Sequence, residues 1–239
     1  RLLVGITGIP ASGKSTLAEL VTEKINALLE HAVTAEQHSI SSGESSSDND
    51  GPSSSTPTLS AILVGLDGWH LTRAQLDAFP DPKLAHDRRG THWTFDGPAY
   101  VSFVKSLRRP LSEFTYSTSV ITAPSFDHAL KDPTPHAVSI LPQHRIVLIE
   151  GLYTFLSIAP WAEAGMLLDE RWYIQLDAEE ASRRLVKRHV STGVAKDMEE
   201  ALWRSEQNDM PNGKFLIANM LEPTRVIQSI DDVVFAPPQ

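Results

Sequence analysis

Residues 4–20 read VGITGIPASGKSTLAEL and place a glycine-rich loop between two apolar segments. From Gly8 to Ser15 the loop matches the pattern G-x-x-x-x-G-K-[ST] at every fixed position. An apolar run over residues 2–7 precedes the loop and predicts a buried strand. Apolar residues at helical spacing follow it and predict a helix: Leu17, Leu20, Val21, Ile25, Leu28 and Leu29. The predicted strand and helix flank the loop as the pattern requires, so a chance match is disfavoured.

The loop predicts a site for a nucleotide. Its glycines allow backbone N–H groups to turn toward phosphate oxygens, and the start of the following helix favours negative charge. In such loops the lysine, here Lys14, reaches the β- and γ-phosphates, while the hydroxyl of Ser15 binds Mg²⁺. We therefore expect nucleotide contacts from Gly8, Ile9, Pro10, Ala11, Ser12, Gly13, Lys14, Ser15 and Thr16.

Further apolar runs alternate with helical patterns along the chain. We predict strands at residues 61–66, 145–151, 171–177 and 226–230. We predict helices at residues 98–107, about 179–189 and about 197–209. This alternation indicates an α/β fold, a three-layer doubly wound parallel sheet, in a single domain over residues 1–239.

A serine-rich segment interrupts this pattern at residues 39–58. It contains nine serines with acidic residues, glycine and proline, and almost no apolar side chain. Such a composition buries too little surface to offset the entropy of ordering, so we predict a disordered insertion within the domain. A plain surface loop is the favoured interpretation, and a tether that carries phosphorylation sites is the alternative.

Two acidic residues come at the ends of apolar strands, Asp67 and Glu150. The carboxyl ends of parallel strands lie at one edge of a sheet, which is also the edge that holds the loop after the first strand. We therefore expect both carboxylates beside the loop, where one accepts a proton from an acceptor hydroxyl and the other orients Mg²⁺. The alternative is that either acid only caps a turn, and for Asp67 alone this alternative is credible.

A basic cluster lies on the predicted helix at about 179–189, with Arg183, Arg184, Lys187 and Arg188. Most charge runs of this kind form a solvated helix face. Because a phosphate loop lies upstream, we favour a helical lid around residues 183–212 whose arginines close over the phosphates. We assign Arg184 and Arg188 as candidate catalytic residues, and the pattern does not choose between them.

The segments between the second and third predicted strands are rich in polar and aromatic residues. Loops positioned by a rigid sheet often carry substrate recognition. His70 follows Asp67 closely and is a further candidate, whereas Trp69 belongs either to the same pocket or to the core. The candidate substrate-binding residues are His70, Arg88, Arg89, Phe126, Asp127 and His128. The histidines lack the tight ligand spacing of a zinc site, so we expect no zinc.

Composition narrows the classes of function. The formal net charge of −9 argues against nucleic-acid binding through a broad basic face, and we expect neither a nucleic-acid nor a membrane partner. The chain has no cysteine, which excludes disulfides and thiolate metal sites and is compatible with the cytoplasmic location that we expect. It begins at Arg1, so we expect the natural start to lie upstream. A homodimer is possible.

Several motifs resemble the P-loop kinases that include uridine kinase, phosphoribulokinase and bacterial-type pantothenate kinase. The segments GIPASGKST, DGWH, IEGLY, PSFDH and ASRRLVKRH resemble that family's phosphate loop, general-base, metal-side, substrate and lid motifs. Phe126 replaces the tyrosine of the substrate motif, and D-G-W-H replaces the D-S-F-Y of uridine kinase. RRGTHWTFD and EQNDMPNGKFL are similar to a fungal and bacterial sugar-kinase-like branch, which implies that Asn208 and Asn212 belong to a nucleotide-side or lid element.

The resemblance implies the nucleoside-kinase-like type of P-loop fold and a chain that uses ATP and Mg²⁺. It implies transfer of the γ-phosphoryl group to a small hydroxyl compound, with Asp67 as general base, Lys14 and a lid arginine at the phosphates, and Ser15 with Glu150 at Mg²⁺. Sugar-like, vitamin-like and nucleoside-like acceptors all stay open. The alternative is an ATP-binding or slowly hydrolysing regulatory module without an acceptor.

Overall fold

The computed structural model describes residues 1–41, 59–110, 120–127 and 129–230. Within these ranges five parallel strands form a sheet in the order β2-β5-β1-β6-β7. The strands are β1 (Leu2–Gly8), β2 (Ser60–Gly65), β5 (His144–Glu150), β6 (Glu170–Gln175) and β7 (Arg225–Gln228). The predicted parallel α/β sheet is thus confirmed. His128 and residues 42–58 of the predicted insertion lie outside the described residues.

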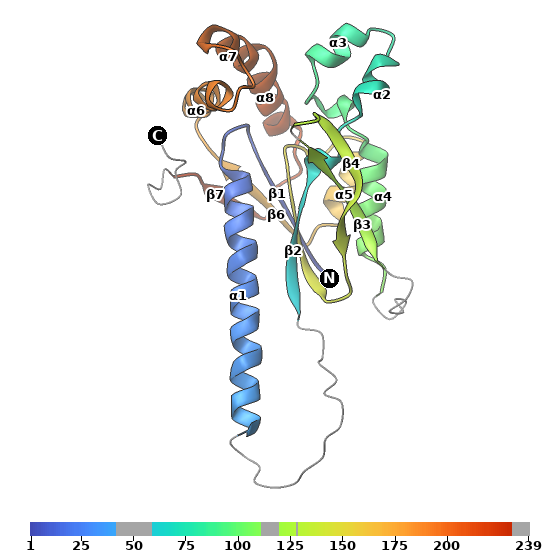
Figure 1. Ribbon diagram of the computed structural model, residues 1–239, viewed down its shortest axis with the longest axis vertical. Coiled ribbons are helices and arrows are strands. Elements are labelled where there is room, and N and C mark those ends of the chain that lie inside the picture. The colour runs from blue at the N-terminus through green and yellow to red at the C-terminus, as the bar shows by residue number, and fades with distance from the viewer. Residues whose placement is uncertain (42–58, 111–119, 128, 231–239) are drawn as a thin grey trace.

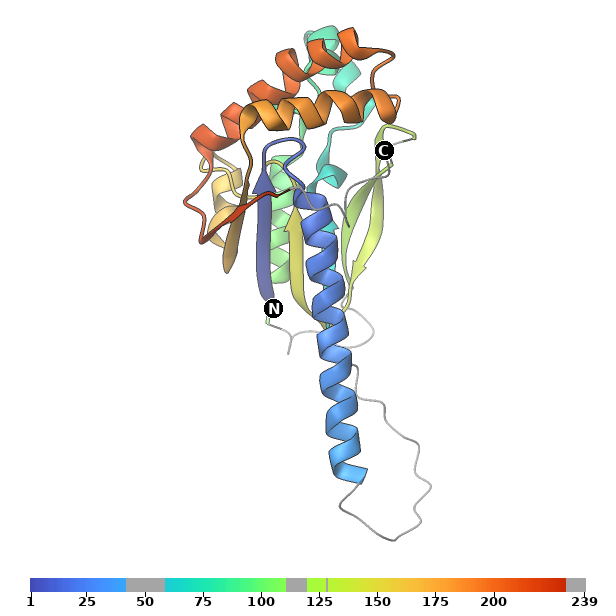
Figure 2. The ribbon, with the colours of Figure 1, turned by 90° about the vertical axis from the view of Figure 1, so that its left-hand side faces the viewer.

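Helices cover both faces of the sheet and its upper edge (Figures 1 and 2). One face carries α1 (Lys14–Ser41), and the other carries α4 (Gly97–Leu107) and α5 (Trp161–Met166). The lid segment forms α6 (Ala178–Ser191), α7 (Met198–Arg204), a π-helical turn (Ser205–Asp209) and α8 (Met210–Asn219). These helices lie over the end of the sheet at which β1 turns into α1. Two short helices, α2 (Arg73–Asp77) and α3 (Pro82–Asp87), follow β2.

Alternation along the central strands builds two separate apolar layers. In β1, Leu3 packs toward α4 and α5, whereas Val4 and Ile6 pack toward α1. In β5, Val147 and Leu148 divide between the same two layers. Successive strand residues point to opposite faces, so a continuous apolar run is what a sheet covered on both sides requires. The layers hold the carboxyl ends of β1, β2 and β5 in register, with Glu150 opposite both Ile6 and Gly65.

A β-hairpin replaces the linker expected between the second and third predicted strands. Strands β3 (Ile121–Asp127) and β4 (Asp132–Ile140) pair in antiparallel fashion. Phe126 and Asp127 therefore lie on a strand, and the interpretation of this segment as a loop was wrong. The turn between the strands is closed by Asp127, whose Oδ1 accepts hydrogen bonds from the backbone N–H groups of Ala129 and Leu130.

Two predicted boundaries also shift. Helix α1 continues through Ser41 and so includes the first residues of the segment predicted as a disordered insertion at 39–58. A favourable helix propagates residue by residue once nucleated, and serine is tolerated within it. The helix predicted at about 197–209 changes after Arg204 into the π turn, in which the backbone bonds shift by one residue.

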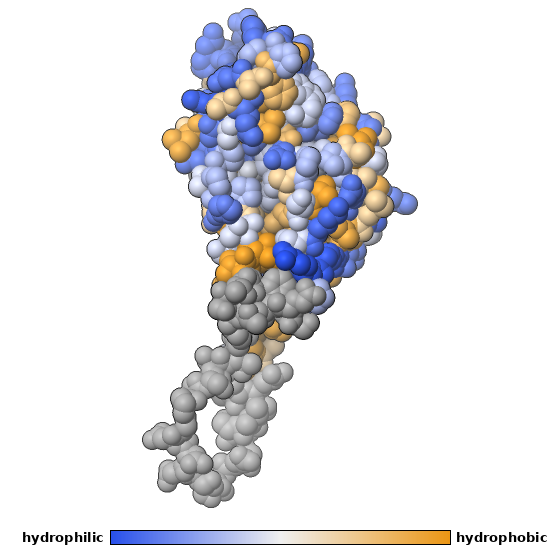
Figure 3. All heavy atoms as spheres, turned by 90° about the vertical axis from the view of Figure 1, so that its right-hand side faces the viewer, coloured by the Kyte–Doolittle hydropathy of each residue, from blue (hydrophilic) through white to orange (hydrophobic). Residues whose placement is uncertain are grey.

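The outer surface mixes residue types. On the face that carries α4 and the hairpin, hydrophobic and hydrophilic residues alternate in small groups (Figure 3). Within the described ranges, no helix combines the length and the apolar character that crossing a membrane requires.

Candidate active site

The glycine-rich loop has the backbone of a phosphate cradle. Gly13 has φ of +83° and Ala11 has φ of +62°, so the chain turns sharply before α1 begins at Lys14. A Cβ atom at Gly8 would lie 2.5 Å from the Ser12 Oγ and 2.8 Å from the Ile174 carbonyl, and only glycine fits there. The Ser12 hydroxyl is buried and has no hydrogen-bond partner within the described part of the chain. A buried polar group without a partner is costly, and phosphate oxygens would satisfy it.

Lys14, Ser15 and Glu150 meet at the end of β1 and β5. The Ser15 hydroxyl donates to Glu150 Oε2 at 3.1 Å. Burial raises the pKa of Glu150, and the negative charge of Asp67 raises it further, whereas Lys14 and the Ser15 bond lower it. Burial lowers the pKa of Lys14, against the opposing attraction of Glu150, Asp67 and Asp209. The strand ends thus bring the predicted lysine, hydroxyl and carboxylates together.

Asp67 lies on a short 3₁₀ turn, Leu66–Trp69, that follows β2 directly. Its side chain is 51% exposed, and its charge acts on both Lys14 and Glu150. Gly68 permits the turn to touch the hairpin, because a Cβ atom there would lie 2.3 Å from the Pro124 carbonyl oxygen. Trp69 is 4% exposed and packs on Tyr100 and Phe103, so of its two interpretations the core one is confirmed.

His70 is placed against the hairpin and the Asp67 turn. Its Nδ1 lies 2.8 Å from the backbone oxygen of Asp67, and its ring packs on Phe95 and Phe126 at centroid distances of 3.9 and 5.0 Å. Phe126 also lies under the Arg89 guanidinium, 5.4 Å from ring centroid to Cζ. His70, one of the predicted substrate-binding residues, thus adjoins Asp67, and Phe126, another, packs on His70.

Arg88 and Arg89 bind internal acceptors. Arg88 Nη1 donates to the backbone carbonyl of Gln207 in the lid. Arg89 donates to the carbonyls of Leu71 and Lys131 and pairs with Asp132 at 3.1 Å. Both guanidinium groups therefore hold neighbouring segments in place. Their direct contact with a substrate stays a prediction, as does that of Asp127.

Helix α6 brings the lid arginines over the loop. The N-cap Asp177 starts the helix by accepting from the backbone N–H groups of Glu179 and Glu180. Arg184 bonds to Glu180 at 2.7 Å and to the Ser229 hydroxyl at 3.2 Å, beside Gly13. The charge of Arg188 acts on Lys14 and lowers the pKa of that lysine further. Arg188 is therefore the lid arginine whose charge reaches the phosphate-binding lysine.

Sequence reasoning missed one carboxylate of the site, Asp209. It ends the π turn, its charge acts on Lys14, and its Oδ2 lies 3.0 Å from Nε2 of the buried His189. The only signal in the sequence was the N-D-x-P-N segment, because a proline after two turn-forming residues indicates a break in a helix. Asn208 and Asn212 approach the Gly90 turn from the same lid element.

The donor set fits Mg²⁺ held together with phosphates. Mg²⁺ prefers oxygen ligands and is usually bound by one or two protein groups, with waters and substrate phosphates completing its shell. Ser15 and Glu150 supply two such oxygens beside the loop. Among the described residues, no group of three or more His, Cys, Asp and Glu side chains is arranged to hold a metal alone.

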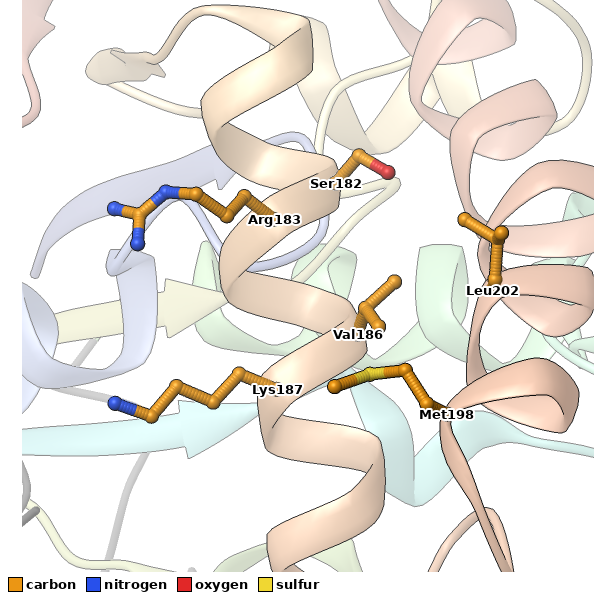
Figure 4. Close-up of a pocket in the computed structure, with 6 residues that line it drawn as sticks. All are labelled: Ser182, Arg183, Val186, Lys187, Met198 and Leu202. Atoms are coloured by element: carbon orange, nitrogen blue, oxygen red, sulfur yellow. The ribbon is translucent and has the colours of Figure 1, made fainter.

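A separate hollow of about 360 Å³ lies between α6 and α7 (Figure 4). Val186, Met198 and Leu202 point into it, whereas the side chains of Arg183 and Lys187 extend away from α7. Its lining contains no residue of the phosphate loop, and we assign it no part in nucleotide binding.

A parallel sheet, a glycine-rich loop before a helix, and two acids at the neighbouring strand ends define a P-loop phosphotransferase. ATP-dependent kinase-like protein notR′ of Aspergillus versicolor is 45% identical over 156 residues, which are 65% of this chain and 89% of that protein. The uridine kinase-like protein C227.14 of Schizosaccharomyces pombe is 30% identical over 230 residues, 96% of this chain and 84% of that protein. No protein-family model matches the chain.

The chain belongs to the family of ATP-dependent P-loop kinases related to uridine kinase. The predicted resemblance is thereby confirmed, as is the use of ATP. The crystal structure of YFH7 of Saccharomyces cerevisiae superposes with a TM-score of 0.76 at 24% identity, over 97% of this chain and 93% of that one. This likeness confirms the P-loop kinase fold.

Proposed function

We propose that this kinase transfers the γ-phosphoryl group of Mg·ATP to a hydroxyl group of a small metabolite. The observation that carries the proposal is the convergence of Lys14, Asp67 and Glu150 beside the phosphate loop. Phosphoryl transfer needs positioning, neutralisation of charge and a group that accepts the hydroxyl proton. Asp67 is an exposed carboxylate that can accept the proton. It lies next to Lys14, which suits phosphate, and Glu150, which suits a metal ion.

Each residue has a distinct role in the proposed reaction. The acceptor oxygen forms a bond to the γ-phosphorus, the bond to the bridging oxygen of ADP breaks, and Asp67 receives the hydroxyl proton. Lys14 and Arg188 stabilise the negative charge of the transferred group. Ser15 and Glu150 would hold Mg²⁺, which supplies neutralising charge on the β- and γ-phosphates when bound.

The test is release of ADP from Mg·ATP across a panel of sugars, nucleosides, pantothenate-like compounds and polyol acids. We expect one class of compound to stimulate turnover strongly, and Asp67→Asn to reduce that turnover by about 10²-fold or more with ATP binding retained. Asp87→Asn, an exposed carboxylate of α3, is the matched control and should leave turnover unchanged. A slow rate that no compound and neither substitution alters would indicate the regulatory ATPase instead.

A further inference from the structure

Asp209 is fixed in the lid by a buried partner. The carboxylate lies 3.0 Å from Nε2 of His189, whose side chain is 10% exposed, against 24% for Asp209. Asp209 ends a π-helical turn, and such turns are frequent at functional sites. A buried histidine that meets a carboxylate restricts the rotamers of that carboxylate, so Asp209 is held in one direction.

The π turn is attached on both sides of the site. Toward the turn at Gly90, Asn208 Nδ2 donates to the Arg89 carbonyl at 3.1 Å. Toward the phosphate loop, α8 packs so closely that a Cβ atom at Gly213 would lie 3.2 Å from Ile9. Asp209 therefore lies between the phosphate loop and the Gly90 turn, where its charge acts on Lys14.

A buried tyrosine supports this placement. The Tyr153 hydroxyl donates to the Gly90 carbonyl at 3.0 Å. Burial, and secondly the negative charge of Asp209, raise the pKa of Tyr153. Asp209 thus lies near the Gly90 turn on the lid side, and Tyr153 reaches the same turn from the segment that follows β5.

Three arginines described on this side of the site, Arg73, Arg88 and Arg89, bind or adjoin acceptors within the chain. Arg89 bonds to Leu71, Lys131 and Asp132, and Arg88 bonds to Gln207. Arg73 lies 3.9 Å from Asp132. His92 stacks on Phe215 at 4.4 Å, and burial lowers the pKa of His92, which favours its neutral form. An anionic acceptor would therefore meet the carboxylates of Asp67 and Asp209, whereas the arginines described beside them already bind groups of the chain, apart from the buried Arg89 Nε, which has no partner among the described residues.

We propose that the acceptor is an uncharged compound with at least two hydroxyl groups, one bound by Asp67 and the other by Asp209. Two carboxylates held at separate points accept hydrogen bonds from hydroxyls and repel a carboxylate or phosphate on the acceptor. His189 is a positioning residue that acts through Asp209. The inference rests on the proposed function and names the chemical class of its acceptor.

The first test compares pairs of acceptors in which one terminal CH2OH group is replaced by a carboxylate: glycerol with glycerate, ribitol with ribonate, and pantothenol with pantothenate. For the pair that is turned over, we expect kcat/KM to be about 10-fold or more higher for the uncharged member. A preference for the acid would overturn this inference and leave the proposed kinase function standing. ADP release that neither these pairs nor the sugars and nucleosides of the wider panel stimulate would overturn both.

The second test substitutes the lid carboxylate. Asp209→Asn should raise KM for the uncharged acceptor by about 10-fold, change KM for ATP by less than about twofold, and improve the anionic member of the pair. Glu206→Gln, an exposed carboxylate on the same turn, is the control and should change neither constant.

His189→Gln should also raise KM for the uncharged acceptor. The double variant should have a KM for the acceptor no higher than that of Asp209→Asn alone. The assignment of Asp209 to the acceptor would be contradicted if the substitutions weakened ATP binding and left acceptor binding unchanged. It would also be contradicted if the effects of Asp209→Asn and His189→Gln were additive.

Discussion

Ser15 and Glu150 are 135 positions apart in the chain, yet the serine hydroxyl donates to the carboxylate at 3.1 Å. The contact exists because β5 is the parallel neighbour of β1, so the residue that ends β5 lies beside the first turn of α1. Both oxygens belong to groups that bind Mg²⁺ well. Their direct contact therefore places two oxygen ligands suited to Mg²⁺ at the phosphate loop. Two predictions for Glu150 follow, one on Mg²⁺ dependence and one on stability.

The first prediction concerns the dependence of kinase activity on Mg²⁺. Glu150→Gln should raise the Mg²⁺ concentration that gives half-maximal kinase activity by about 10-fold or more, because ligands and their close partners affect metal affinity on this scale. Activity at saturating Mg²⁺ should recover in part. Titration of Mg²⁺ at fixed ATP measures the effect, and Glu163→Gln, an exposed carboxylate on α5, is the control. An unchanged midpoint would remove Glu150 from the metal site.

The second prediction concerns the effect of Glu150 on the stability of the nucleotide-free protein. Burial, the largest cause, raises the pKa of Glu150, so the folded state holds this proton more tightly than the unfolded chain does. A raised carboxyl pKa contributes stability at low pH, and that contribution is lost as pH rises from the unfolded pKa through the folded one. At pH 7 burial of this carboxyl group is therefore less favourable to folding than it is at low pH.

Replacing it by the neutral glutamine should increase the thermal midpoint of the nucleotide-free protein by about 2–4 °C, the shift expected for 1 kcal/mol in a domain of this size. The difference from wild type should shrink below about pH 4.5, where the wild-type side chain is itself neutral. Thermal unfolding at pH 7 and at pH 4 measures both values. A lower midpoint at pH 7 would show that the hydrogen bond from Ser15 and the attraction of Lys14 outweigh desolvation.

Three arginines on α6 differ in their surroundings and should differ in function. Arg188 is the one whose charge acts on Lys14, so Arg188→Ala should reduce kcat by about 10²- to 10³-fold, as loss of a transition-state donor does. Arg184 bonds to Glu180 and Ser229 beside Gly13, so Arg184→Ala should mainly raise KM for ATP. Steady-state kinetics with varied ATP separates these effects.

Arg183→Ala is the matched control from the same helix. The Arg183 side chain is 67% exposed and pairs with Glu180, so its loss should leave kcat and both Michaelis constants nearly unchanged. Equal losses in all three variants would show that the arginines act only through the stability of the lid.

The sheet edge and the lid arginines were predictable from sequence, whereas the pairing of Asp209 with His189 in the lid was not. Lys14 and Glu150 follow from apolar strands and parallel connection, because topology alone places the strand ends together. Asp209 and His189 come together through the packing of α6 against the π turn, which no periodicity encodes. The hairpin was missed because Pro124, Pro133 and many polar residues weaken the strand pattern of its two arms.

The close approach of Gly68 to the hairpin gives a prediction about the position of the general base. A methyl group there would lie 2.3 Å from the Pro124 carbonyl oxygen, which is backbone and cannot rotate away. Gly68→Ala should therefore separate the Asp67 turn from β3 and destabilise the protein by about 1–3 kcal/mol, as overpacking does. Because Asp67 moves with the turn, kcat should also fall. Denaturant unfolding and steady-state kinetics give the two values.

Gly193→Ala separates this effect from the general cost of replacing a glycine. Gly193 has φ of +70° and no neighbouring atom within 4 Å of an added Cβ, so its substitution meets backbone strain but no clash. It should cost about 1 kcal/mol and leave kcat nearly unchanged, because the added methyl group contacts no neighbouring atom. If Gly68→Ala were no more harmful than Gly193→Ala in stability and kcat, the hairpin would not be what holds Asp67 in place.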